Sequence, residues 1–113
     1  MRKQMIENAA YDVATQVRAV EDCIESALAE IAELQGKMIR ARAVTGVGIS
    51  VGHSAFEQLV GATQGLVSAR GGIANCHAAL VDARGKVPGL RTVSFGDGDA
   101  CPKTAVADLR VVA

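Results

Sequence analysis

Apolar residues recur with a seven-residue period along the N-terminal part of the chain. Counted as heptads with Ala10 at position a, every a and d position between Ile6 and Ala41 is apolar, and no proline interrupts the run. A heptad pattern sustained this long is typical of a coiled-coil or bundle helix. It predicts one helix over residues 3–44, about 60 Å long. The a positions are Ala10, Val17, Ile24, Ile31 and Met38, and the d positions are Ile6, Val13, Val20, Ala27, Leu34 and Ala41.

A second seven-residue repeat follows a glycine-rich, uncharged connection over residues 45–53. Ser54 and Glu57 have the spacing of a capping box, which satisfies backbone amides at the start of a helix. Pro88 then ends the pattern, so we predict a helix over 54–85 and an irregular or partly disordered tail over 86–113. One row of this helix contains Leu59, Leu66, Ile73 and Leu80, and a row one residue later contains Val60, Val67, Ala74 and Val81.

Two long helices with a short connection are expected to fold back as an antiparallel hairpin. Pairing outward from the connection places Arg70 near Glu30, as an ionic contact that sets the register. The same register leaves the N-terminal end of the first helix without a partner in the second. The tail or another subunit should therefore cover Ile6, Ala10 and Val13.

The apolar face of each predicted helix is wider than a single neighbouring helix can cover. In the first helix, for example, Ala14 and Leu28 extend the face beyond the a and d positions. A wide face implies more than one packing neighbour. We therefore expect a single all-α domain, residues 1–113, that forms a homodimer with a four-helix bundle. The expected interface residues are Val17, Ile24, Ile31, Leu34, Leu59, Leu66, Ile73 and Leu80.

Charge and hydropathy narrow the possible classes of function. Twelve Lys and Arg balance twelve Asp and Glu, so the chain as a whole lacks the positive charge of a general nucleic-acid or anionic-membrane binder. Residues 43–69 carry one charge, Glu57, but their glycines and polar side chains dilute the segment below a membrane-spanning helix. The N-terminal segment lacks the apolar run of a signal peptide, and we expect a cytoplasmic protein.

Few residues are candidates for chemistry. The three cysteines have no CxxC or zinc-ligand spacing, which favours reduced thiols. The hairpin register would nevertheless bring Cys23, Cys76, His77 and Asp22 within about one helical turn of each other, either as polar contacts or as a metal site. No nucleophile has an evident base and orienting partner. We therefore expect a non-enzymatic protein without a cofactor.

A row of small residues that includes Gly61, Gly65 and Gly72 follows another face of the second helix. Each glycine inside a helix costs about 0.5–1 kcal/mol relative to alanine. The row could form a ridge where a helix of another subunit or of a protein client approaches closely. It could equally face solvent, with the opposite face of the helix supplying the stability.

These observations favour a self-associating helical hairpin that acts as an assembly or adaptor module for an unknown protein partner. One alternative is a metal- or small-ligand-binding bundle that uses Cys23, Cys76 and His77. The length and two-helix plan also resemble the WXG100 secretion substrates, and this resemblance implies a small secreted protein. The Trp-x-Gly turn of that family is absent here, as is a clear Tyr-x-x-x-Asp/Glu motif in the tail.

Overall fold

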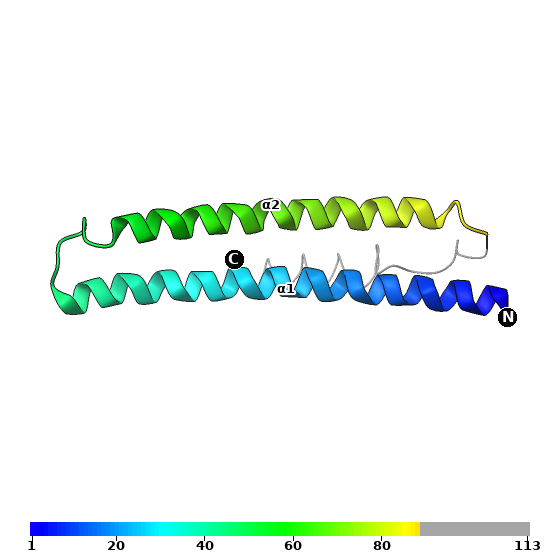
Figure 1. Cartoon of the computed structure of the whole chain (residues 1–113), viewed down its shortest axis with the longest axis horizontal. Helices are drawn as coiled ribbons and strands as arrows, with labels where there is room; N and C mark the ends of the chain where they lie inside the picture. Colours follow the sequence, from blue (N-terminus) through cyan, green and yellow to red (C-terminus); the bar gives the residue numbers. More distant parts are fainter. Residues whose placement is uncertain (89–113) are drawn as a thin grey trace, which may run out of the picture. The chain divides into compact units, whose positions relative to one another are not determined.

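The structure is a computed structural model that describes residues 1–88, of which 86% are helical. Helix α1 spans Arg2–Thr45 and helix α2 spans His53–Arg84, and together they form an all-α helical hairpin (Figure 1). The prediction of this hairpin is confirmed. Most of the predicted tail, residues 89–113, lies outside the described residues, and dimerisation into a four-helix bundle stays a prediction.

Two glycines shape the connection between the helices. Gly46 and Gly52 have φ angles of 73° and 81°, in the left-handed region that glycine adopts without steric penalty. The backbone N–H of Gly46 donates to the carbonyl of Arg42 (3.1 Å), which closes the last turn of α1. The N–H of Phe56 donates to the carbonyl of Gly52 (3.2 Å), which opens the first turn of α2.

The predicted capping box between Ser54 and Glu57 is wrong. Helix α2 already begins at His53, so Ser54 lies inside the first turn rather than at its N-cap. The Glu57 carboxylate instead lies 3.4 Å from Nε2 of His53, four residues earlier on the same helix. The start of α2 is therefore set by the turn at Gly52.

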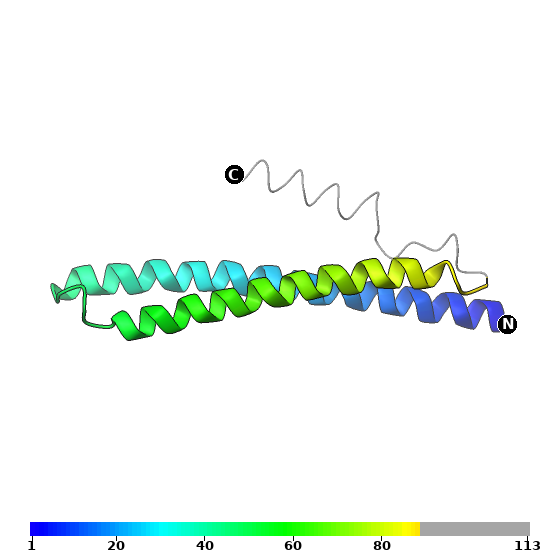
Figure 2. The ribbon, with the colours of Figure 1, turned by 90° about the horizontal axis from the view of Figure 1, so that it is seen from above.

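The chain divides into two compact units, and each contains a segment of both helices. Of the described residues, the terminal unit comprises Met1–Val20 together with 73–88, and the loop unit comprises Glu21–Gly72. Within each unit the two helix segments run antiparallel and side by side (Figure 1 and Figure 2). The expectation of a single domain stays a prediction.

Two alanines are the only buried residues among residues 1–88. Ala10 and Ala14 are 6% and 8% exposed, and Ile6, Val81 and Val87 pack against them in the terminal unit. Because the two alanines are four residues apart, they lie on one face of α1. Their small side chains let α2 approach closely.

This packing corrects the prediction that the N-terminal end of α1 has no partner in the second helix, because Val81 of α2 packs there; Val87 belongs to the predicted tail, residues 86–113, and its contact agrees with that part of the prediction. Val87 follows α2 in a turn in which its N–H donates to the carbonyl of Arg84 (3.2 Å). The end of α2 and this turn therefore reach the cluster of Ala10 and Ala14, against which Ile6 also packs. Val13, the third residue of that prediction, is exposed.

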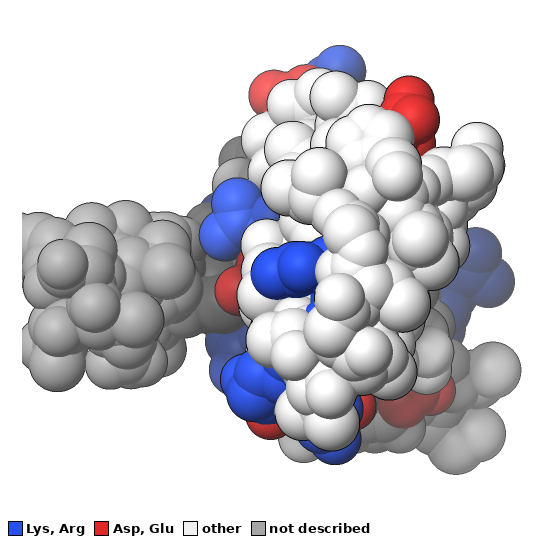
Figure 3. Space-filling view, turned by 90° about the vertical axis from the view of Figure 1, so that its left-hand side faces the viewer, with Lys and Arg blue, Asp and Glu red and all other residues white. Residues whose placement is uncertain are grey.

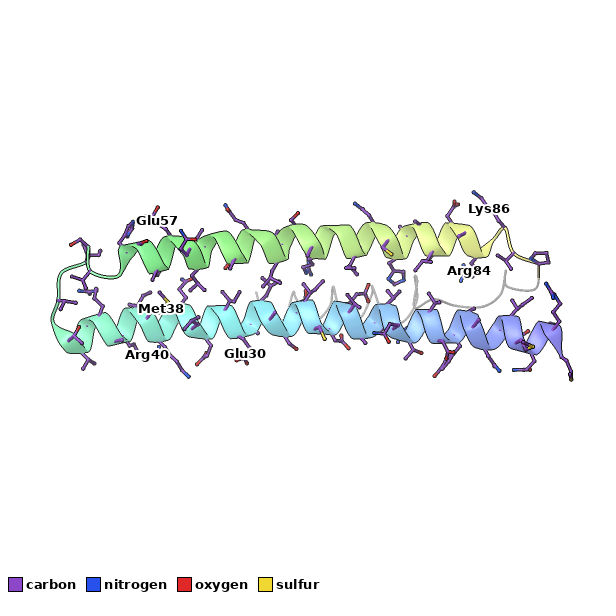
Figure 4. The ribbon with its side chains drawn as sticks, in the orientation of Figure 1. Glu30, Met38, Arg40, Glu57, Arg84 and Lys86 are labelled. Atoms are coloured by element: carbon purple, nitrogen blue, oxygen red, sulfur yellow. The ribbon has the colours of Figure 1, made fainter. Side chains whose placement is uncertain are left out.

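The loop unit contains no buried residue. Its apolar side chains on the facing rows, such as Ile31 and Leu66, are half-buried. Met38 projects from α1 toward α2, whereas Glu30 and Arg40 project away from it (Figure 4). The loop unit is therefore a pair of helices with an apolar seam that remains partly open.

The ion pair between the helices of the loop unit joins other residues than predicted. The Nε of Arg70 donates to Oε1 of Glu25, not to Glu30. Glu25 follows Ile24 by one residue and Glu30 precedes Ile31 by one, so the two acids lie on opposite flanks of the row that contains both isoleucines. Only the flank with Glu25 is within reach of Arg70.

Candidate functional site

The residues predicted to form a dimer interface are partly exposed in the single chain. Seven of the eight are half-buried, and Leu34 is 48% exposed. The seven are Val17, Ile24, Ile31, Leu59, Leu66, Ile73 and Leu80. Each of these side chains therefore keeps apolar surface that a further partner could bury.

Exposed aliphatic side chains flank the facing row of α2 in the loop unit. Val60 and Val67 are 43% and 55% exposed, and each directly follows a half-buried leucine, Leu59 or Leu66. Because Val60 and Val67 are seven residues apart, they lie on the same flank of α2. One neighbouring helix thus shields the centre of the apolar face and leaves its flank open.

The glycine row on α2 is also open within the described chain. A Cβ atom added at Gly61, Gly65 or Gly72 would meet no other atom within 4 Å. All three residues are exposed. The space beside them would admit a close helix, and it would equally admit larger side chains.

The candidate metal ligands are divided between the two compact units. Asp22 and Cys23 are exposed residues of the loop unit, whereas the exposed Cys76 and the half-buried His77 belong to the terminal unit. Both cysteines are free thiols. No group of three or more His, Cys, Asp or Glu residues within residues 1–88 could hold a metal ion.

The connection presents a surface that the sequence pattern did not predict, which we call the loop tip (residues 44–51). Its large aliphatic side chains, Val44, Val47, Ile49 and Val51, are all exposed. The signal was visible in the sequence, because an uncharged run separates Arg42 from His53. This run predicts only a connection, since a sequence pattern does not show which side of a loop is covered.

Charged residues along α1 are separated by sign within the loop unit. The segment nearest the loop tip carries Lys37, Arg40 and Arg42, and the preceding residues 21–36 carry acids without any base. The acids are Glu21, Asp22, Glu25, Glu30 and Glu33. Although the whole chain has no net charge, a basic segment therefore lies beside an apolar loop.

Comparisons with known proteins identify no relative for this chain. No protein-family model, no curated protein and no solved structure matches it. In the part of the chain that the structure describes, neither helix has the apolar run required to cross a membrane. A function therefore has to be argued from the exposed surfaces themselves.

Proposed function

We propose that this protein is a non-enzymatic assembly module in which two copies of the hairpin pack into a four-helix bundle. The proposal is supported by the contrast between the few buried residues of the hairpin and its many exposed apolar ones. Only Ala10 and Ala14 are buried among residues 1–88, whereas Leu34, Val60 and Val67 are exposed on helices with heptad periodicity. Helices in proteins derive most of their stability from packing of an apolar face.

The energy available from further burial is substantial. Fully burying a valine or leucine side chain contributes about 1.5–3 kcal/mol relative to full exposure. Leu34, Val60 and Val67 are roughly half exposed, so each has about half of that stabilisation still to gain. The half-buried residues of the facing rows would add to this gain in a bundle.

A symmetric pair of hairpins is the simplest arrangement that buries these residues. In a two-fold dimer the same surface of each subunit packs against its copy. The seven-residue spacing of Val60 and Val67 suits packing of side chains between those of an adjacent helix. The open row of Gly61, Gly65 and Gly72 would then be available to a helix of a protein client.

The mass of the full-length protein in solution tests the proposal. We expect light scattering at micromolar concentration to give twice the chain mass of 11.6 kDa. The double variant Val60→Asp/Val67→Asp should be monomeric, because it would bury two unpaired carboxylates from each subunit in the interface.

Ile49→Asp is the matched control, since Ile49 is an exposed aliphatic residue of the loop tip. This variant should keep the dimeric mass. A wild-type protein that remains at the mass of one chain over the whole concentration range would refute the proposal. So would a double variant that dimerises like the wild type.

A further inference from the structure

The loop tip presents a contiguous apolar surface. Val44, Ile49 and Val51 are 87%, 80% and 59% exposed, and residues 43–52 contain no charge. Seen from the loop end, the molecule shows a largely uncharged surface with Lys and Arg side chains, and some Asp and Glu side chains, around it (Figure 3). Exposed apolar patches with a polar surround mark sites of interaction with a protein or a membrane.

Internal hydrogen bonds hold the loop tip in one conformation. The guanidinium of Arg42 donates from Nη1 to the carbonyl of Val47 (3.0 Å). The N–H of Val51 donates to the carbonyl of Gly48 (3.1 Å), and the N–H of His53 donates to the carbonyl of Ser50 (3.3 Å). Binding through this surface therefore requires little ordering of the backbone, which favours affinity.

The charges nearest the tip are mainly basic. Arg42, Arg40 and Lys37 precede Val44 by only a few residues, so they lie within about 11 Å of it along the axis of α1. The nearest acid on α1, Glu33, is about 16 Å away, which exceeds the Debye length of about 8–10 Å at physiological ionic strength.

Helix α2 contributes one acid near this end of the loop unit. Glu57 is paired with His53 at 3.4 Å and projects away from α1 (Figure 4). Near the loop tip, α1 thus carries three basic residues and α2 carries one carboxylate. The potential that an approaching surface meets at the tip is positive.

We propose that the loop tip docks onto the surface of a bilayer that contains anionic phospholipids. Ile49 and Val44 enter the boundary between headgroups and acyl chains, and Lys37, Arg40 and Arg42 contact the phosphates. A lipid surface fits this tip because aliphatic side chains need no shaped pocket in a membrane, and the basic residues complement its charge. Among the acids of α1, Glu33 lies nearest to these phosphates, about 6 Å from Lys37 along the helix axis, and the other acids lie beyond the Debye length from Lys37.

Co-sedimentation of the full-length protein with vesicles tests this proposal. We expect binding to vesicles of equal parts phosphatidylcholine and phosphatidylglycerol, and little binding to pure phosphatidylcholine. Ile49→Asp should lower the partition coefficient at least about tenfold. Arg40→Gln should lower it about fivefold, and added salt should reduce this difference.

Met5→Asp is the control, because Met5 is an exposed apolar residue of α1 in the terminal unit. It should bind vesicles like the wild type. Failure of the wild type to bind anionic vesicles would overturn the proposal, as would equal losses for Ile49→Asp and Met5→Asp.

Measurements of mass separate this proposal from the proposed dimer. If Ile49→Asp abolished a wild-type dimer, the tip would contact a second copy and the membrane proposal would be wrong. If the wild type were monomeric yet bound anionic vesicles through Ile49, the membrane proposal would stand and the assembly proposal would fall.

Discussion

The terminal unit and the loop unit use the same two helices but differ in how well their side chains are shielded. In the terminal unit, Ala10 and Ala14 are buried against Val81 and Val87. In the loop unit, larger residues such as Ile31 and Leu66 stay half-buried, and no residue is buried. Small side chains let two helices close on each other, whereas large ones set a wider spacing between the helix axes.

Because of this difference, we expect the terminal unit to contribute mainly to stability and the loop unit mainly to association. The alanine contact is completed within one chain, so it contributes to stability without a partner. The loop unit keeps exposed aliphatic residues on the flank of α2 and at the loop tip, and both proposed interactions use those residues. Substitutions in the terminal unit should therefore affect stability more than association.

The largest expected effect is the loss of the alanine contact in the terminal unit. Ala14→Glu would bury a carboxylate without a partner, and we expect it to lower the free energy of unfolding by about 2–4 kcal/mol. Ala19→Glu is the control, because Ala19 is an exposed alanine of the same helix segment. Urea unfolding followed by circular dichroism, at one protein concentration, measures both. Similar losses for the two variants would contradict the assignment of Ala14 to a core.

A smaller change in the free energy of unfolding, of opposite sign, is expected for a substitution on the open surface of the loop unit. Gly65→Ala should raise the free energy of unfolding by about 0.5–1 kcal/mol, since alanine favours the helix and its Cβ meets no atom within 4 Å. Gly52→Ala should instead lower it by about 1 kcal/mol, because φ of Gly52 is 81°.

Thermal unfolding of both variants checks this contrast. If Gly65→Ala were destabilising and also weakened self-association, the glycine row would be packed in the assembly. The loop unit would then be less open than the single chain indicates.

The smallest expected effect is that of the ion pair in the loop unit. Arg70 and Glu25 are 51% and 52% exposed, and pairs this exposed typically contribute about 0.2–1 kcal/mol. A double-mutant cycle with Arg70→Gln and Glu25→Gln should show a coupling in that range that decreases with salt. The parallel cycle with Glu30→Gln should show none. Equal coupling in both cycles would contradict the observed register.

The positions of the helices were predictable because their signals are local. The predicted ranges 3–44 and 54–85 agree with Arg2–Thr45 and His53–Arg84 to one residue at each end. Apolar periodicity, glycines and a proline each act on neighbouring backbone, so the chain order alone reveals them. The predicted capping box was wrong. Ser54 and Glu57 have the spacing of that motif, but the turn at Gly52 starts the helix before Ser54 is reached.

The contacts between the helices were less predictable. Counting outward from the connection placed Arg70 beside Glu30, but counting does not show which flank of α1 a side chain can reach. Counting also missed the packing of Val81 of α2 against Ala10 and Ala14. The loop tip was missed because exposure depends on what surrounds a segment in space.

By itself the amino-acid sequence determined two long helices, the break between them and the apolar face of each, because these properties arise from residues a few positions apart. Tertiary structure alone decided that alanines close one unit, that Glu25 pairs with Arg70 and that the aliphatic loop tip faces outward. Those outcomes depend on how two segments distant in the chain approach each other. The size of the facing side chains and the side of each helix that faces its neighbour determine that approach, and both act only when the two helices are packed together.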